Sequence, residues 1–104
     1  MNELNENDFD ASVGSGLALV DFGAEWCGPC KALVPTMEKI SSAYDGRLNV
    51  YSVDIDNHPA LAAKNGVMSV PTLILFKDGK PVDRVVGLIS EGDLRSKIEE
   101  QIGS

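Results

Sequence analysis

The hydrophobic pattern of the chain alternates between runs typical of buried strands and runs typical of helices. Leu17–Ala24 is apolar apart from Asp21, and this continuous run predicts a strand buried on both faces. From Cys30 to about Tyr44, apolar residues recur at the spacing of one helix face, which predicts a long helix. Pro35 lies inside it and predicts a kink, because the apolar face continues beyond the proline.

Turn and capping signals bound the shorter elements. The shorter helices are predicted around Phe9–Val13 and from Pro59 to Asn65, and the shorter strands at Leu48–Ile55 (buried), Leu73–Phe76 and Val82–Val86. A last helix is predicted to begin after Ser90 and to carry Leu94, Ile98 and Ile102 on one face. Asp78-Gly79 is a hairpin signal, and Met1–Glu6 fits either a short edge strand or a frayed end. The order predicts an α/β fold whose sheet is parallel at first and ends antiparallel, with helices on both faces.

Composition narrows the function classes. The 104 residues are the size of one domain, 1–104. The net charge of −7 and the lack of a Lys/Arg-rich run argue against nucleic-acid binding, which needs a basic face. There is no apolar segment long enough to cross a bilayer and no basic region followed by an apolar run, so we expect a cytoplasmic protein. In that reducing compartment, two close cysteines are more typical of catalysis or metal binding than of a structural disulfide.

The segment Trp26-Cys27-Gly28-Pro29-Cys30 holds both cysteines and the single tryptophan, where the strand gives way to the long helix. Backbone N–H groups and the positive end of the helix dipole favour a thiolate there. Cys27 is nearer the helix start, in what we expect to be the more exposed turn, and is the predicted nucleophile. Cys30, one turn further on the buried face, is the predicted resolving cysteine.

Two other uses of the cysteines remain open at this point. A zinc site needs about four ligands, whereas the chain offers two sulfurs and His58 in a distant predicted loop. A purely structural disulfide would be unusual in a reducing compartment. The position of the pair at a strand-to-helix junction favours redox chemistry over both.

Asp21 and Pro71 are the other residues that stand out. An ionised carboxylate inside a buried strand costs several kcal/mol of desolvation, so the pKa of Asp21 should be raised. Asp21 is therefore either a proton carrier near the cysteines or a carboxylate hydrogen-bonded to a neighbouring strand end. Pro71 must begin a strand or lie at an edge, and base rates alone favour a trans Val70–Pro71 bond.

Several separated motifs together resemble the thioredoxin family, in order and spacing, from about Phe9 to Ile102. They are Val20-Asp21-Phe22, the segment from Trp26 to Lys31, Pro35, Val70-Pro71-Thr72, Phe76-Lys77-Asp78-Gly79 and Gly87. The resemblance implies the thioredoxin fold, an α/β fold with a mixed sheet of four to five strands. It also implies a protein-disulfide reductase that cycles between a Cys27/Cys30 dithiol and disulfide.

The resemblance further assigns residues and partners. Asp21 would be the buried acid/base behind Cys30, and Pro71 would be a cis proline facing the cysteines. An extended substrate segment would lie beside Val70 in the manner of strand addition. The residues of the implied substrate groove are Trp26, Gly28, Pro29, Val70, Pro71, Gly87 and Leu88. The chain would be a monomer without a bound cofactor, taking electrons from NADPH through thioredoxin reductase and passing them to disulfide-bearing proteins, with no nucleic acid or membrane partner.

Two positions depart from the family pattern. Gly23 stands where the family often has a second tryptophan, and Ser52 where it often has a lysine close to the buried aspartate. Without that cation nothing offsets the desolvation of Asp21, so we expect its pKa to be raised more than in relatives that carry the lysine.

Two rival functions stay open on sequence alone. A disulfide oxidase or isomerase of an oxidising compartment would use the same fold, although the Gly28-Pro29 pair resembles the reducing members. A binding subunit of a larger assembly would not need its cysteines at all.

We predict that Trp26 fluorescence reports the redox state of the cysteines, because the single indole is adjacent to them in sequence. Its emission intensity should change when dithiothreitol reduces the protein. An unchanged spectrum would place the indole away from the sulfurs.

Overall fold

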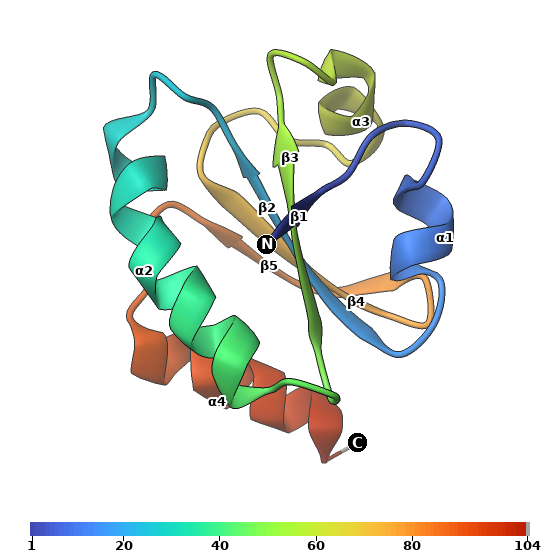
Figure 1. Cartoon of the computed structure of the whole chain (residues 1–104), viewed down its shortest axis with the longest axis vertical. Helices are drawn as coiled ribbons and strands as arrows, with labels where there is room; N and C mark the ends of the chain where they lie inside the picture. The colour runs from blue at the N-terminus through green and yellow to red at the C-terminus, as the bar shows by residue number, and fades with distance from the viewer. Residues whose placement is uncertain (104) are drawn as a thin grey trace.

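The structure is a computed structural model that describes residues 1–103 as a mixed five-stranded sheet with helices on both faces (Figure 1). The elements are β1 (Asn2–Glu3), α1 (Phe9–Val13), β2 (Leu17–Gly23), α2 (Gly28–Ala43), β3 (Asn49–Asp54), α3 (Pro59–Lys64), β4 (Thr72–Lys77), β5 (Lys80–Val86) and α4 (Glu91–Ile102). This order confirms the α/β prediction. No helix within residues 1–103 is long and apolar enough to cross a bilayer.

The strand order β1-β3-β2-β4-β5 places β2 at the centre of the sheet. β2 pairs in parallel with β3 and antiparallel with β4, and the β4–β5 hairpin closes the sheet on the antiparallel side. The hairpin turns through Asp78 and Gly79, at φ 51° and 84°, which is the backbone that two-residue hairpin loops require. The predicted change from parallel to antiparallel pairing is confirmed.

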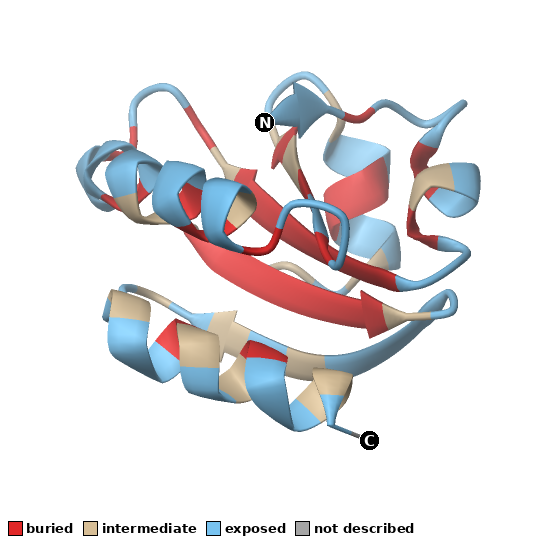
Figure 2. Cartoon of the chain, turned by 60° about the horizontal axis from the view of Figure 1, so that its bottom comes forward, coloured by how far each residue is buried: buried red, intermediate tan, exposed pale blue. Residues whose placement is uncertain are grey.

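Side chains of β2 alternate between the two helical layers. Leu17 and Leu19 pack with residues of α2 and α4, whereas Val20 and Phe22 pack with residues of α1 and α3. Figure 2 shows the middle of the sheet buried and the outer faces of the helices exposed. Because alternation continues along the strand, Asp21 belongs to the face that α2 covers.

The N-terminal side of the sheet is less buried than predicted. β2 is buried along almost its whole length, but in β3 only Val50 and Val53 are buried, so the predicted second buried strand is buried only in part. The reason is that β3 has β1 as its outer neighbour, and β1 has only two paired residues, Asn2 and Glu3. Met1–Glu6 therefore contributes a short edge strand.

Local signals account for the helix ends. The Oγ of Ser90 accepts a hydrogen bond from the backbone N–H of Asp93 at 3.1 Å, as the predicted capping box requires at this end of α4. α2 continues through Pro35 without ending, and its buried residues Leu33, Met37 and Ile40 recur at helical spacing on both sides of the proline. The kink predicted at Pro35 stays a prediction.

We predict that Leu33→Ala destabilises the fold by about 3 kcal/mol, because Leu33 is 1% exposed and its truncation leaves a cavity under α2. The matched control is Val34→Ala, one position further on the same helix and 37% exposed, which should change the free energy of unfolding by less than about 0.5 kcal/mol. Urea unfolding followed by circular dichroism measures both. Equal losses at the two positions would contradict the packing described here.

Candidate active site

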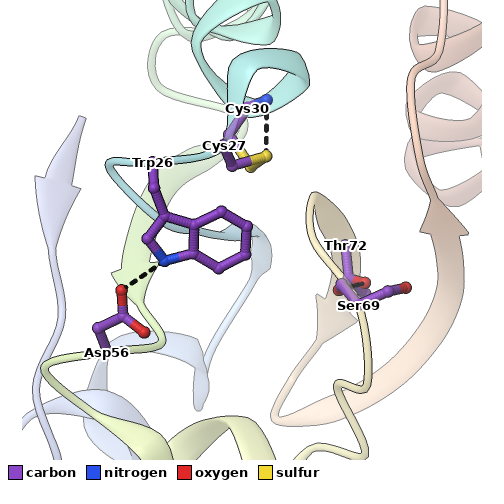
Figure 3. The surroundings of a disulfide bond; sticks show 6 residues. All are labelled: Trp26, Cys27, Cys30, Asp56, Ser69 and Thr72. Carbon is purple, nitrogen blue, oxygen red and sulfur yellow. Dashed lines mark hydrogen bonds between the residues drawn. A yellow bond between two sulfur atoms is a disulfide. The ribbon is translucent and has the colours of Figure 1, made fainter.

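The cysteine pair lies at the start of α2. Cys27 is the N-cap residue, with extended backbone, and its Sγ accepts a hydrogen bond from the backbone N–H of Cys30 at 3.1 Å. Pro29 lies in the first turn, where a missing N–H costs nothing. A disulfide joins Cys27 and Cys30, whose Cα atoms are 5.2 Å apart (Figure 3). The helix terminus thus directs a donor and the positive end of its dipole at the Cys27 sulfur.

The expected difference in exposure between the cysteines was wrong. Cys27 is 4% exposed and Cys30 is 7% exposed, so Cys27 does not occupy the more open turn in the disulfide form. The reason is tertiary: the two cysteines form a small apolar cluster with Ala24, and Ile55 and Val70 pack against it from other segments. The case for Cys27 as nucleophile therefore depends on its helix-terminal position rather than on exposure.

Trp26 is held beside the pair by a residue that the sequence analysis missed. Its side chain is 68% exposed, and its indole Nε1 donates to Oδ2 of Asp56 at 2.7 Å (Figure 3). Asp56 follows β3, and the carboxyl ends of the parallel strands β2 and β3 meet at one edge of the sheet. Ligand-binding residues of α/β sheets gather at the carboxyl ends of the strands, and this tendency was the available signal that a polar residue after β3 lies near the cysteines.

The loop that ends at Pro71 faces the cysteine pair. The Val70–Pro71 bond is cis, which confirms what the family resemblance implied and makes the base-rate expectation of a trans bond wrong. The Thr72 hydroxyl donates to the carbonyl oxygen of Ser69 at 2.7 Å (Figure 3). The N–H of Gly87 donates to the carbonyl oxygen of Pro71 at 2.8 Å, so these two predicted groove residues are brought together.

The remaining groove residues are solvent-facing. Gly28 and Pro29 are exposed, and the Leu88 side chain is 61% exposed. Met68, which the sequence analysis did not single out, is 97% exposed two residues before Val70. An unusually exposed large apolar side chain has no signature in a single sequence, so this residue emerges only from the structure.

Asp21 is a buried carboxylate, and one of its oxygens lacks a hydrogen bond. Asp21 is 6% exposed, and its Oδ1 has no hydrogen-bond partner among the described residues. Burial raises the pKa of Asp21 to about 6, which confirms the predicted direction. The alternative of a carboxylate whose Oδ1 is satisfied by a strand end does not hold.

Both departures from the family pattern lie beside this carboxylate. Ser52 is the direct partner of Asp21 in the β2–β3 pairing, so it lies next to the buried carboxylate. A methyl group at Gly23 would lie 3.4 Å from Sγ of Cys30 and 3.9 Å from Oδ1 of Asp21. Gly23 therefore leaves open a space that adjoins both groups.

The cysteines are not part of a metal site among the residues that the structure describes. Within residues 1–103, no group of three or more His, Cys, Asp or Glu side chains could hold a metal ion. His58, the only imidazole of the chain, lies with its Nδ1 2.6 Å from Oε1 of Glu6 and so engages the N-terminal segment.

Comparison with known proteins gives one consistent family. The family model described as Thioredoxin matches residues 1–100. The chain is 47% identical over 100 residues to a thioredoxin of Staphylococcus saprophyticus and 45% identical to one of Staphylococcus aureus, in each case covering 96% of both chains. A solved structure of a mutant thioredoxin from Halobacterium salinarum superposes with a TM-score of 0.87 at 38% identity, covering 95% of this chain and 88% of that one.

We predict that Asp21→Asn stabilises the protein at neutral pH and not in acid. The carboxyl pKa is about 6 in the folded state against 3.8 in the reference state, so the folded protein binds more protons between about pH 4 and pH 6. The wild-type free energy of unfolding should therefore fall as pH rises through this window, by about 3 kcal/mol at most, and stay level above it.

The variant should not show this fall, because its neutral amide side chain has no charge to bury. Urea unfolding from pH 4 to pH 8 measures the difference, with the exposed Asp45→Asn as the control for loss of one negative charge. Parallel pH profiles for wild type and Asp21→Asn would show that burial of the carboxylate has no energetic consequence.

Proposed function

The chain belongs to the thioredoxin family, and on that premise we propose that Cys27 is its nucleophile, Cys30 its resolving cysteine and Asp21 the proton acceptor between them. The family and the cysteine pair at the active-site spacing make the chain a thiol–disulfide oxidoreductase that reduces protein disulfides. The observation that carries the proposed roles is the contact between the Cys30 N–H and the Cys27 sulfur at the start of α2.

The first step is attack by Cys27 on a substrate disulfide. In the reduced protein, the α2 terminus stabilises the Cys27 thiolate through its N–H groups and dipole. The thiolate bonds to one substrate sulfur, the substrate S–S bond breaks, and the other substrate sulfur leaves as a thiolate that takes a proton from solvent. The product is a mixed disulfide between Cys27 and the substrate.

The second step uses Cys30 and Asp21. At neutral pH a carboxyl whose pKa is about 6 is mostly ionised and can accept the Cys30 proton, directly or through a water in the space beside Gly23. The Cys30 thiolate then attacks the Cys27 sulfur, the bond to the substrate breaks, and the second substrate sulfur leaves and is protonated. Two electrons have passed to the substrate, and the protein is left with the Cys27–Cys30 disulfide.

The substrate groove is proposed to run past the cysteines between Trp26 and the cis-proline loop. Three large apolar residues on the segments proposed to flank this groove, Trp26, Met68 and Leu88, are 68%, 97% and 61% exposed. Such side chains supply contact area to a partner without selecting for its charge. An extended substrate segment would pair with the backbone near Val70, which packs against the cysteine cluster.

The reducing electrons are proposed to come from NADPH through a thioredoxin reductase, in the cytoplasm. The family implies this donor, and the Gly28-Pro29 pair between the cysteines resembles that of the reducing members. The proposed substrates are disulfide-bearing proteins. Nucleic acid is not a proposed partner, because a protein with a net charge of −7 repels a phosphate backbone.

We predict that Cys27→Ser and Cys30→Ser both stop turnover, but that only Cys30→Ser accumulates a covalent complex with the substrate. Cys27→Ser should abolish insulin-disulfide reduction, because no nucleophile forms the mixed disulfide. Cys30→Ser should also stop turnover but accumulate a covalent complex with the substrate, because nothing resolves it. Non-reducing gel electrophoresis and mass spectrometry detect this complex, and dithiothreitol should release it. Retained turnover by either variant would refute the assignment.

A second prediction tests the helix-terminal thiolate itself. In the reduced protein, iodoacetamide at neutral pH should alkylate Cys27 faster than Cys30 and faster than free cysteine, as read by peptide mass mapping over time. Cys30→Ser provides the matched sample in which only Cys27 can react. A Cys27 rate no higher than that of free cysteine would remove the physical basis of the first step.

A further inference from the structure

A row of polar side chains crosses the sheet under α2. Glu3 of β1 and Asp21 of β2 are both paired with Ser52 of β3, one on each side. Residues in register on adjacent strands point to the same face, and for Asp21 that face is the one covered by α2. Glu3, Ser52 and Asp21 therefore form a line that runs from the sheet edge inward to the neighbourhood of Cys30.

A pocket of about 260 Å³ lies between this row and the first turns of α2. We call it the Asp21 pocket. Asp21, Gly23 and Cys30 are among its lining residues, while Glu3 and Glu25 are exposed residues of its lining. The proposed groove residues Trp26, Val70 and Leu88 do not line it. Cys30 thus has the substrate groove on one side and the Asp21 pocket on another.

Two small residues keep the pocket open. Gly23 has no side chain, and a methyl group there would already contact the Cys30 sulfur at 3.4 Å. Ser52, beside Asp21, is only half-buried and carries a short side chain without charge. The volume exceeds the roughly 30 Å³ that one water takes in the liquid, so a short organic molecule has room.

The unpartnered oxygen of Asp21 indicates what the pocket would bind. The residue is more than nine-tenths buried, Oδ1 accepts no hydrogen bond from the described residues, and burial raises its pKa. A buried ionised carboxylate left in this state is costly, and a hydrogen-bond donor with positive charge would remove that cost.

The rest of the lining selects among such donors. Ala24 and Val34 supply apolar walls, which suit a short alkyl chain. The charged groups of the lining are the carboxylates of Glu3, Asp21, Glu25 and Asp54, the ammonium group of Lys31 and the N-terminal ammonium group of Met1, so carboxylates are in the majority. Asp54 also lines the pocket, but its Oδ1 already accepts the backbone N–H groups of residues 56 and 57.

We propose that the Asp21 pocket binds a short aliphatic ammonium ion, whose ammonium group donates to the Asp21 carboxylate while its alkyl chain lies against the apolar walls. A diamine of suitable length places its second ammonium group near Glu3 and Glu25 and therefore binds more tightly than a monoamine. This binding does not depend on electron transfer, because the pocket is present in the disulfide form.

Binding and ionisation of Asp21 are coupled. A ligand that prefers the ionised carboxylate lowers the Asp21 pKa, and by the same coupling its affinity falls as the pH drops below about 6 and the carboxyl is protonated. A ligand indifferent to Asp21 would show neither effect. These two linked shifts distinguish specific binding from general attraction to an acidic protein.

The test uses the full oxidised chain at constant ionic strength, titrated with n-butylammonium, 1,4-diaminobutane and neutral n-butanol. Amide NMR shifts should saturate at Gly23, Ala24 and Val53 with both amines, more tightly with the diamine, and not with butanol. Asp21→Asn should weaken binding at least about tenfold, whereas Asp45→Asn, which removes the same charge at an exposed site away from the pocket, should not. Glu25→Gln should weaken the diamine more than the monoamine.

A second measurement needs no variant. The side-chain carboxyl carbon of Asp21 should titrate at lower pH in saturating 1,4-diaminobutane than in its absence. Linear shifts without saturation, equal affinity in Asp21→Asn, equal binding of butanol, or an unmoved Asp21 titration would each overturn the proposal and leave a pocket that holds water. Because no electron transfer is measured, a negative result here leaves the disulfide-reductase assignment untouched.

Discussion

The central strand β2 is confined on every side, and this confinement gives the active site its geometry. Backbone hydrogen bonds tie it to β3 and β4, and helices cover both of its faces, so each side chain can point in only two directions. Asp21 and Gly23 point to the α2 side, and the chain leaves β2 just before the turn that begins α2. The carboxylate and the Cys30 sulfur are therefore neighbours as a consequence of strand alternation.

The same confinement makes Asp21 costly for the fold. A strand with apolar neighbours on both faces would be more stable with an uncharged residue at this position, and the raised pKa is the thermodynamic sign of that cost. In the mechanism proposed above, however, Asp21 accepts the proton of Cys30, and an acceptor whose pKa is close to neutral is well matched to that step. Under that proposal, the stability lost at Asp21 is offset by a gain in chemistry.

Cys30 lies at the meeting point of two environments that differ in chemistry. Toward Val70 and the cis-proline loop, the surface is apolar and exposed, which suits contact with extended protein segments. Toward Gly23 and Ser52, there is a pocket bounded by carboxylates. Gly23 has no side chain and Ser52 a short one, so the opening follows from these two residues. It gives small molecules and protons a path to Asp21 that a bound protein substrate need not block.

The sequence by itself determined the order of the elements, the start of α2 at the cysteine pair and the burial of Asp21, because periodicity, turn residues and capping signals act between near neighbours in the chain. Tertiary structure alone decided the burial of Cys27 by Ile55 and Val70, the hydrogen bond from Trp26 to Asp56, and the partial exposure of β3. It also created the pocket between Glu3, Ser52 and α2. These features depend on the register and packing of segments far apart in the chain, which no local pattern records.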